Sequence, residues 1–125
     1  MFEDDDDTRA EAARMLAESG SPAAVEAFRS LAMDAGVDES VRLEAARGLT
    51  EIDERAAAEA CCRIAADESV DESVRLEAAM LAQGDTRWAT KAFSAIATDD
   101  SVDDSVRLEA ARMLAEIDDR PARAH

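Results

Sequence analysis

The chain has 125 residues, of which 30 are Asp or Glu and 14 are Lys or Arg, so its formal net charge is −16. This length suits one domain, and the excess of carboxylates argues against direct binding to nucleic acid or to an anionic membrane, because both need Lys and Arg. The two cysteines, Cys61 and Cys62, are adjacent and form no disulfide framework, so we expect a reducing, cytoplasmic environment.

The residue usage predicts an all-α chain, because Ala, Leu, Glu and Arg dominate and Gly and Pro fall between segments. We predict about seven helices, near residues 8–19, 22–33, 39–52, 54–66, 72–83, 86–98 and 104–118. An acidic N-terminal tail is expected over residues 1–7 and a C-terminal tail over residues 119–125. The whole chain, 1–125, is thus predicted to be a single domain with its repeats in residues 8–118.

Internal repetition organises the sequence. The string Val-Arg-Leu-Glu-Ala-Ala occurs at 41–46, 74–79 and 106–111, and a weaker copy occurs at 8–13. The starts of these copies are separated by 33, 33 and 32 residues, and a fixed period of this size is typical of repeat architectures. With two helices in each unit, the chain contains about three and a half repeats.

The repeated pattern resembles that of HEAT-like repeats. It consists of Asp38-Glu39-Ser40-Val41-Arg42 followed by Ala45-Ala46, Leu49 and Ile52. The short form of the helices is similar to the group first named for phycobilisome lyases. The resemblance implies an α-α superhelix, or HEAT-like solenoid, whose second helices line a concave face and which serves mostly as a binding scaffold. On the helical wheel, one face of the helix predicted over 39–52 is expected to be core: Val41, Ala45, Gly48, Leu49 and Ile52.

Two charged features of the repeat each allow a functional and a structural interpretation. The repeated arginine occurs at Arg9, Arg42, Arg75 and Arg107. These arginines form either a stripe that binds anions or a ladder of ion pairs with aspartates in the turns. The ladder is favoured because suitable partners are available, at Asp38, Asp71 and Asp103. The acidic turns either hold Ca²⁺ or Mg²⁺ or cap helices. Because EF-hand spacing is absent, capping is favoured, and no metal or other cofactor is predicted.

Candidate partner-binding residues lie on the second helix of each unit. The leucine of the motif is about 200° from its valine and is predicted to point outward on the concave face, as Leu43, Leu76 and Leu108. An acidic row lies beside it, formed by Glu11, Glu44, Glu77 and Glu109, and arginines follow one turn later at Arg14, Arg47 and Arg112. These residues either stabilise their own helices through i, i+3 pairs or form a groove for a segment carrying apolar anchors and Lys or Arg.

Trp88 takes the place that alanines hold in the other repeats, at Ala23 and Ala56. It is either a binding hot spot or a cover over the contact between repeats, and the second interpretation is favoured. Catalytic patterns are sparse: the one histidine is His125 at the end of the tail, and no Ser-His-Asp set is evident.

The function predicted from these patterns is a non-catalytic scaffold or adaptor, active as a monomer or weak dimer. It binds a basic or amphipathic segment of a protein or peptide, with neither nucleic acid nor membrane as a direct partner. The alternative, suggested by the resemblance alone, is an enzyme or accessory factor of the phycobilin-lyase-like group that binds a small ligand. In that case Cys62 or a glutamate of the concave face acts on the ligand.

Overall fold

The computed structural model describes the backbone of residues 5–119 and the side chains of residues 7–117. Within this part, the chain forms seven α-helices and one 3₁₀ turn and contains no strand: α1 (Asp5–Glu18), α2 (Ala23–Met33), α3 (Glu39–Ile52), α4 (Glu54–Ala65), α5 (Glu72–Leu81), η1 (Ala82–Gly84), α6 (Thr86–Ala97) and α7 (Asp104–Asp119). The prediction of an all-α chain with seven helices is confirmed.

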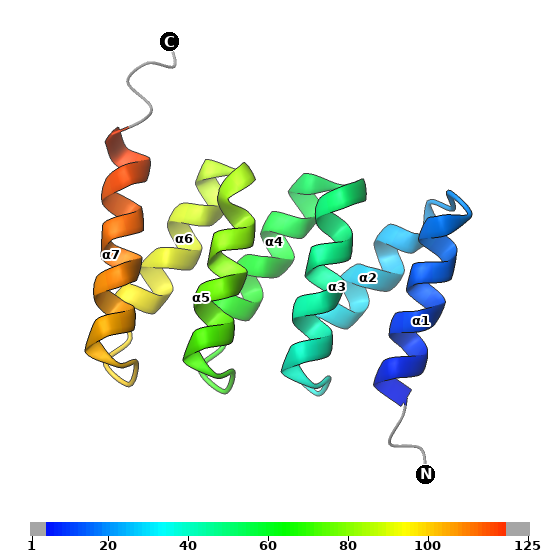
Figure 1. Cartoon of the computed structure of the whole chain (residues 1–125), viewed down its shortest axis with the longest axis horizontal. Helices are drawn as coiled ribbons and strands as arrows, with labels where there is room; N and C mark the ends of the chain where they lie inside the picture. The colour runs from blue at the N-terminus through cyan, green and yellow to red at the C-terminus, as the bar shows by residue number, and fades with distance from the viewer. Residues whose placement is uncertain (1–4, 120–125) are drawn as a thin grey trace.

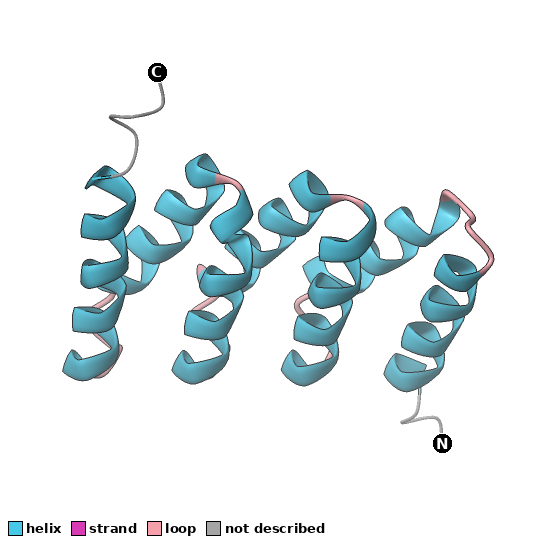
Figure 2. Cartoon of the chain, turned by 45° about the horizontal axis from the view of Figure 1, so that its top comes forward, coloured by secondary structure: helices cyan, strands magenta, loops and turns pink. Residues whose placement is uncertain are grey.

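The helices form two layers. One layer holds the second helices of the repeats, α1, α3, α5 and α7, and the other holds the first helices, α2, α4 and α6 (Figures 1 and 2). Each first helix contacts the second helix before it and the one after it. We call the region between two successive second helices an interval, so that the described chain has an α1–α3, an α3–α5 and an α5–α7 interval.

Two helix boundaries differ from the sequence prediction by more than one residue. Helix α1 begins at Asp5, so part of the expected acidic tail is helical; acidic residues at a helix N-terminus interact favourably with the helix dipole. Helix α5 ends at Leu81, and a 3₁₀ turn follows it. This repeat is one residue shorter than the others. The predicted C-terminal tail, from residue 120 on, lies outside the described residues.

The acidic turns cap the second helices, as predicted. The carboxylates of Asp38, Asp71 and Asp103 each accept a hydrogen bond from the backbone N–H of the serine two residues later, at 3.0–3.1 Å. Hydrogen bonds from the same serines lower the pKa of these three carboxyls. In the part of the chain that the structure describes, no group of three His, Cys, Asp or Glu residues is arranged to hold a metal ion.

The core lies between the two layers and is rich in alanine, which allows the helices to approach closely. The first helices contribute many of its larger buried side chains: Phe28, Leu31, Cys61, Ile64, Phe93 and Ile96. From the predicted core face of α3, Val41, Ala45 and Leu49 are buried, whereas Ile52 is largely exposed. The expectation for Ile52 was wrong because this residue, the last of α3, lines an open pocket between α1 and α3.

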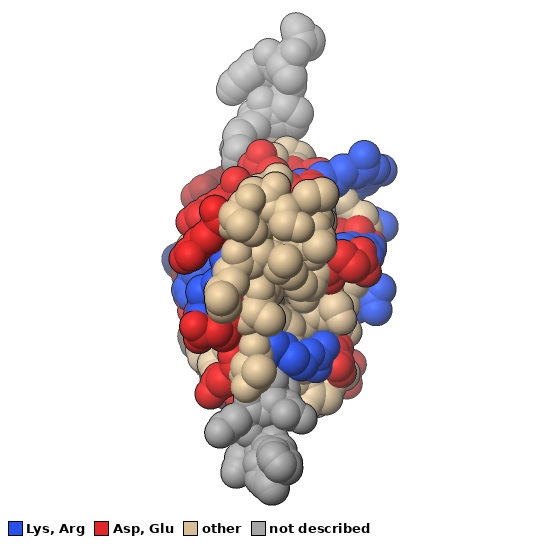
Figure 3. Space-filling model, turned by 90° about the vertical axis from the view of Figure 1, so that its right-hand side faces the viewer, with Lys and Arg blue, Asp and Glu red and all other residues tan. Residues whose placement is uncertain are grey.

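The two ends of the described solenoid expose helix faces. At the α1 end, uncharged residues form a band with charged side chains at its margins (Figure 3). Met15 on α1 is 62% exposed, and Leu108 on α7, at the opposite end, is 56% exposed.

Candidate protein-interaction surface

The repeated arginine has a structural role. Arg42 Nε donates to the carbonyl oxygen of Ala32 at the end of α2 (3.0 Å), and its Nη1 donates to Asp67 in the turn before α5 (2.9 Å). Arg75 repeats this arrangement with Ala65 and Asp99, at 2.8 and 2.9 Å. The ladder interpretation is confirmed for these two buried side chains, although their partners differ from those expected.

The expected partners, Asp38, Asp71 and Asp103, cap helices instead, and the aspartate four residues before each one binds the arginine. Hydrogen bonds from Ser69 and from Arg42 lower the pKa of Asp67 to about 2. Hydrogen bonds from Ser101, together with Arg75, lower the pKa of Asp99 to about 2. These carboxylates are therefore ionised at neutral pH and already engaged.

The glutamate and arginine rows pair from one second helix to the next. Arg14 Nη2 donates to Glu44 on the following helix at 2.9 Å, and Arg47 pairs with Glu77 in the same way. The expected pairing within one helix, between Glu44 and Arg47, is therefore replaced by a contact between helices. On the next second helix, α5, Met80 takes the place of the arginine. Glu109 of α7 therefore has no corresponding arginine on α5 as a partner.

The expectation that Leu43 points outward was wrong. Leu43 is 6% exposed, whereas Leu76 is half-buried and Leu108 is 56% exposed. Leu43 lies one turn before Arg47 on the same side of α3, and Arg47 contacts α5, so this side faces the next repeat rather than solvent. The three leucines consequently do not form a continuous apolar stripe.

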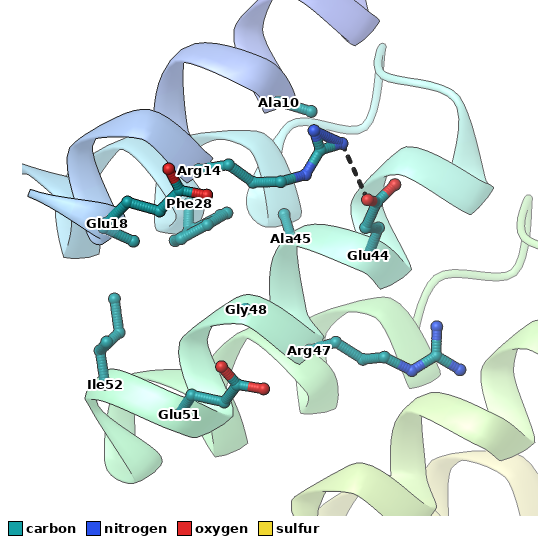
Figure 4. A pocket seen from close by; sticks show the side chains of 11 residues that line it. Ala10, Arg14, Glu18, Phe28, Glu44, Ala45, Arg47, Gly48, Glu51 and Ile52 are labelled. Atoms are coloured by element: carbon teal, nitrogen blue, oxygen red, sulfur yellow. Dashed lines mark hydrogen bonds and ion pairs between the residues drawn. The ribbon is translucent and has the colours of Figure 1, made fainter.

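A pocket opens in the α1–α3 interval. It has a volume of about 330 Å³, and Phe28 of α2 lies between the two second helices that form its walls (Figure 4). Its lining residues are Ala10, Arg14, Ala17, Glu18, Phe28, Glu44, Ala45, Arg47, Gly48, Glu51 and Ile52.

Two small residues account for the pocket. Ala10 stands where the next two second helices carry Leu43 and Leu76. Gly48 stands where α5 carries Leu81, and a Cβ at this glycine would lie only 2.8 Å from Cζ of Phe28. The aromatic ring therefore occupies the space that a side chain at position 48 would need. These departures from the repeat were the available sequence signal, and the prediction did not use them.

Carboxylates surround the pocket. Glu44 is paired with Arg14, and Arg47 is paired with Glu77. Glu18 and Glu51 are exposed, one on each wall (Figure 4), and neither forms an ion pair with another of the described residues. The rim therefore offers two unpaired negative charges, while the arginines beside them are already engaged.

The remaining predicted residues lie elsewhere. Trp88, on α6, is half-buried against the core, with Lys91 Nζ 5.0 Å from its ring centroid, and its indole nitrogen is buried without a hydrogen bond. The structure thus places Trp88 in the first-helix layer, apart from the glutamate rows. Burial raises the pKa of Cys61 to about 12 and also raises that of Cys62, which lowers their thiolate content.

Two layers of alternating helices, joined by the same arginine ladder from repeat to repeat, define an α-solenoid repeat protein. A family model described as HEAT repeats matches residues 2–83. The chain therefore belongs to the HEAT-repeat family. The searches of curated proteins and of solved structures found no match. Among the helices of residues 5–119, none is long and apolar enough to cross a membrane.

Proposed function

We propose that this protein is a non-catalytic interaction module that binds a basic or amphipathic segment of another protein at the α1–α3 pocket. The observation that carries the proposal is an apolar pocket with unpaired carboxylates on both walls. Family membership supports the same class of function, because the concave surfaces of helical repeat proteins commonly serve for binding.

The size and lining of the pocket favour an apolar side chain as the anchor. Its volume of 330 Å³ is at the small end of the range of about 300–1,000 Å³ that ligand pockets occupy. Phe28, Ala10, Ala17, Ala45 and Ile52 supply apolar contact surface. A single Leu, Ile, Met or Phe side chain of a partner would bury its surface there without leaving a polar group unsatisfied.

The charge around the pocket favours Lys or Arg next to that anchor. Glu18 and Glu51 are available for a cation, and the net charge of −16 attracts a basic segment at long range. A segment that continues along the second helices toward α5 would meet Glu77 and the half-buried Leu76. Leu108, Glu109 and Arg112 on α7 extend the same proposed contact surface, with Trp88 outside it.

A peptide-display selection tests the proposal. A random-peptide library is selected on the unmodified protein and counter-selected on Ala10→Leu, which restores the leucine of the other repeats and fills the pocket. Ala23→Leu, which adds the same side chain at an exposed position of α2, serves as the matched control. The peptides that bind the unmodified protein and Ala23→Leu, but not Ala10→Leu, should combine an apolar residue with neighbouring Lys or Arg.

Peptides that bind all three proteins equally, or pocket-dependent peptides without cations, would contradict the proposal. The alternative, a small-ligand accessory factor, gains no specific support from the structure. Cys62 is on α4 and is not among the residues that line the pocket.

A further inference from the structure

Two of the three intervals, α1–α3 and α3–α5, contain an arginine that reaches forward from one second helix to the next. Arg14 and Arg47 reach the glutamates Glu44 and Glu77 of the following helices. The leucine on the same side, Leu43 in α3, is buried by this contact. The forward face of α3 therefore carries one leucine and one arginine, and the backward faces of α3 and α5 carry the glutamates that receive the arginines.

Helix α7 has a forward face with nothing packed on it among residues 5–119. By alignment of the repeats, Leu108 corresponds to Leu43, and Arg112 corresponds to Arg47. Leu108 is 56% exposed, and Arg112 is exposed and forms no ion pair with the other described residues. Arg107, which corresponds to the ladder arginines, keeps the hydrogen bond from its Nε to a backbone carbonyl, that of Ala97 (3.3 Å). Its other nitrogens lie 3.5 and 3.7 Å from the exposed carboxylates of Asp100 and Asp104, in place of an aspartate from a following repeat.

Helix α1 has the complementary backward face. Its residues Glu11, Ala12 and Met15 correspond to Glu44, Ala45 and Gly48 of α3. Ala45 is buried by the preceding helix, whereas Ala12 and Met15 are exposed, Met15 by 62%. Glu11 lies 3.8 Å from Arg14 of its own helix, a longer distance than the 2.9 Å of the contact between Arg14 and Glu44.

We propose that a second copy of this chain docks its α1 face on the α7 face of the first, head to tail. Arg112 of one copy then pairs with Glu11 of the next, as Arg14 pairs with Glu44 inside the chain. Leu108 packs against Ala12 and Met15 of the second copy. The donor and the acceptor halves of this contact are on opposite ends of the described solenoid, and their charges are complementary.

The geometry sets the kind of assembly. A head-to-tail contact joins different faces, so it produces open chains or rings of copies rather than a two-fold symmetric dimer. Among the described residues, 5–119, no first helix lies before α1 or after α7, so the proposed contact involves only one of the two layers that hold an internal interval. The association is therefore weak and depends on protein concentration. It uses the outer faces of α1 and α7 and not the α1–α3 pocket. Leu108 and Arg112 also border the proposed partner surface, so self-association is measured without any partner peptide.

Sedimentation velocity over a wide range of protein concentration tests this inference, at about 0.15 M salt, where the Debye length of about 8 Å reduces repulsion between acidic copies. The unmodified protein should show an average mass that rises with concentration beyond two copies. Leu108→Glu, Glu11→Arg and Arg112→Glu should each abolish the rise. All three positions are exposed, so circular dichroism should show unchanged helicity.

The charge reversals distinguish the head-to-tail contact from other contacts. The double variant Glu11→Arg/Arg112→Glu should recover the association, and a mixture of the two single variants should associate as well, because each restores a pair for the other. A symmetric contact between two α7 faces would respond to Arg112→Glu but not to Glu11→Arg. That response, a mass that stays at one copy, or failure of the double variant to recover would each overturn the inference.

Discussion

The α1–α3 and α3–α5 intervals are built from the same repeat but differ in how tightly they close. Arg42, which spans the α3–α5 interval, is 2% exposed and lies 2.9 Å from Asp67. Its counterpart Arg9 in the α1–α3 interval is 41% exposed and lies 3.4 Å from Asp34. Leu43 is buried in the second interval, whereas Ala10 leaves a pocket in the first. The residues that the two intervals share thus stabilise the packing of the helices, and the residues that differ between them create the candidate site.

The largest expected effect on the free energy of unfolding comes from breaking the arginine ladder in the α3–α5 interval. Arg42→Ala leaves Asp67 and the carbonyl of Ala32 without their partner, and removal of one member of a buried ion pair costs about 3–5 kcal/mol. Arg9→Ala breaks an exposed pair, so its cost should stay below about 1 kcal/mol. Urea unfolding of both variants measures the difference. Equal losses would show that the two intervals do not differ in this contact.

Leu43, which is buried in the α3–α5 interval, should give the next largest effect on the free energy of unfolding when it is substituted. Leu43→Ala introduces into the α3–α5 interval the small residue of the α1–α3 interval, and a buried Leu→Ala change costs about 2–5 kcal/mol. The reverse change, Ala10→Leu, fills an existing pocket and should change the unfolding free energy by less than about 1.5 kcal/mol. Chemical unfolding followed by circular dichroism gives both values. A large loss in Ala10→Leu would mean that the pocket cannot admit a leucine side chain.

Substitutions at Gly48 and Phe28 should have coupled effects on the free energy of unfolding. Gly48→Ala places a Cβ 2.8 Å from the ring, and overpacking costs about 1–3 kcal/mol, partly offset by a gain of about 1 kcal/mol in helix propensity. In a Phe28→Leu background the clash is relieved, so the same change should be close to neutral or stabilising. A double-mutant cycle measures this coupling. Additive effects of the two changes would contradict the proposed contact.

The smallest expected effect is on the pH dependence of stability under acidic conditions. The pKa of Asp67 in the folded state is about 2, below its ordinary value of 3.8. The stability that this group contributes is therefore fully present above about pH 4 and is lost as the pH falls toward 2. Asp67→Asn should remove part of the pH dependence in this window, as measured by urea midpoints at successive pH values. Unchanged pH dependence in this variant would contradict the depressed pKa.

The periodic features of the chain could be predicted from the sequence. The repeat period, the seven helices and the aspartate caps follow from local patterns, because helix formation and capping depend on residues close in the chain. The burial of Leu43 could not be predicted from a helical wheel, since the wheel considers one core face and a second helix of a solenoid also contacts the next repeat. The partners of the arginines depend in the same way on contacts across 24 and 25 residues.

The pocket was missed for a different reason. A search for repeated residues favours positions that recur, whereas Ala10 and Gly48 matter because they do not. Their effect also depends on Phe28, which lies on another helix. Comparing the repeats for the loss of side-chain volume at aligned positions would have indicated this interval.

The central claim is that the α1–α3 pocket binds the anchor of a partner segment. Its most direct test is calorimetric titration of one selected peptide, with an apolar residue beside Lys or Arg, into the unmodified protein, Ala10→Leu and Ala23→Leu. Ala10→Leu should lose at least about tenfold in affinity, or ~1.4 kcal/mol, while Ala23→Leu should bind as the unmodified protein does. Equal binding by Ala10→Leu and the unmodified protein would contradict the claim.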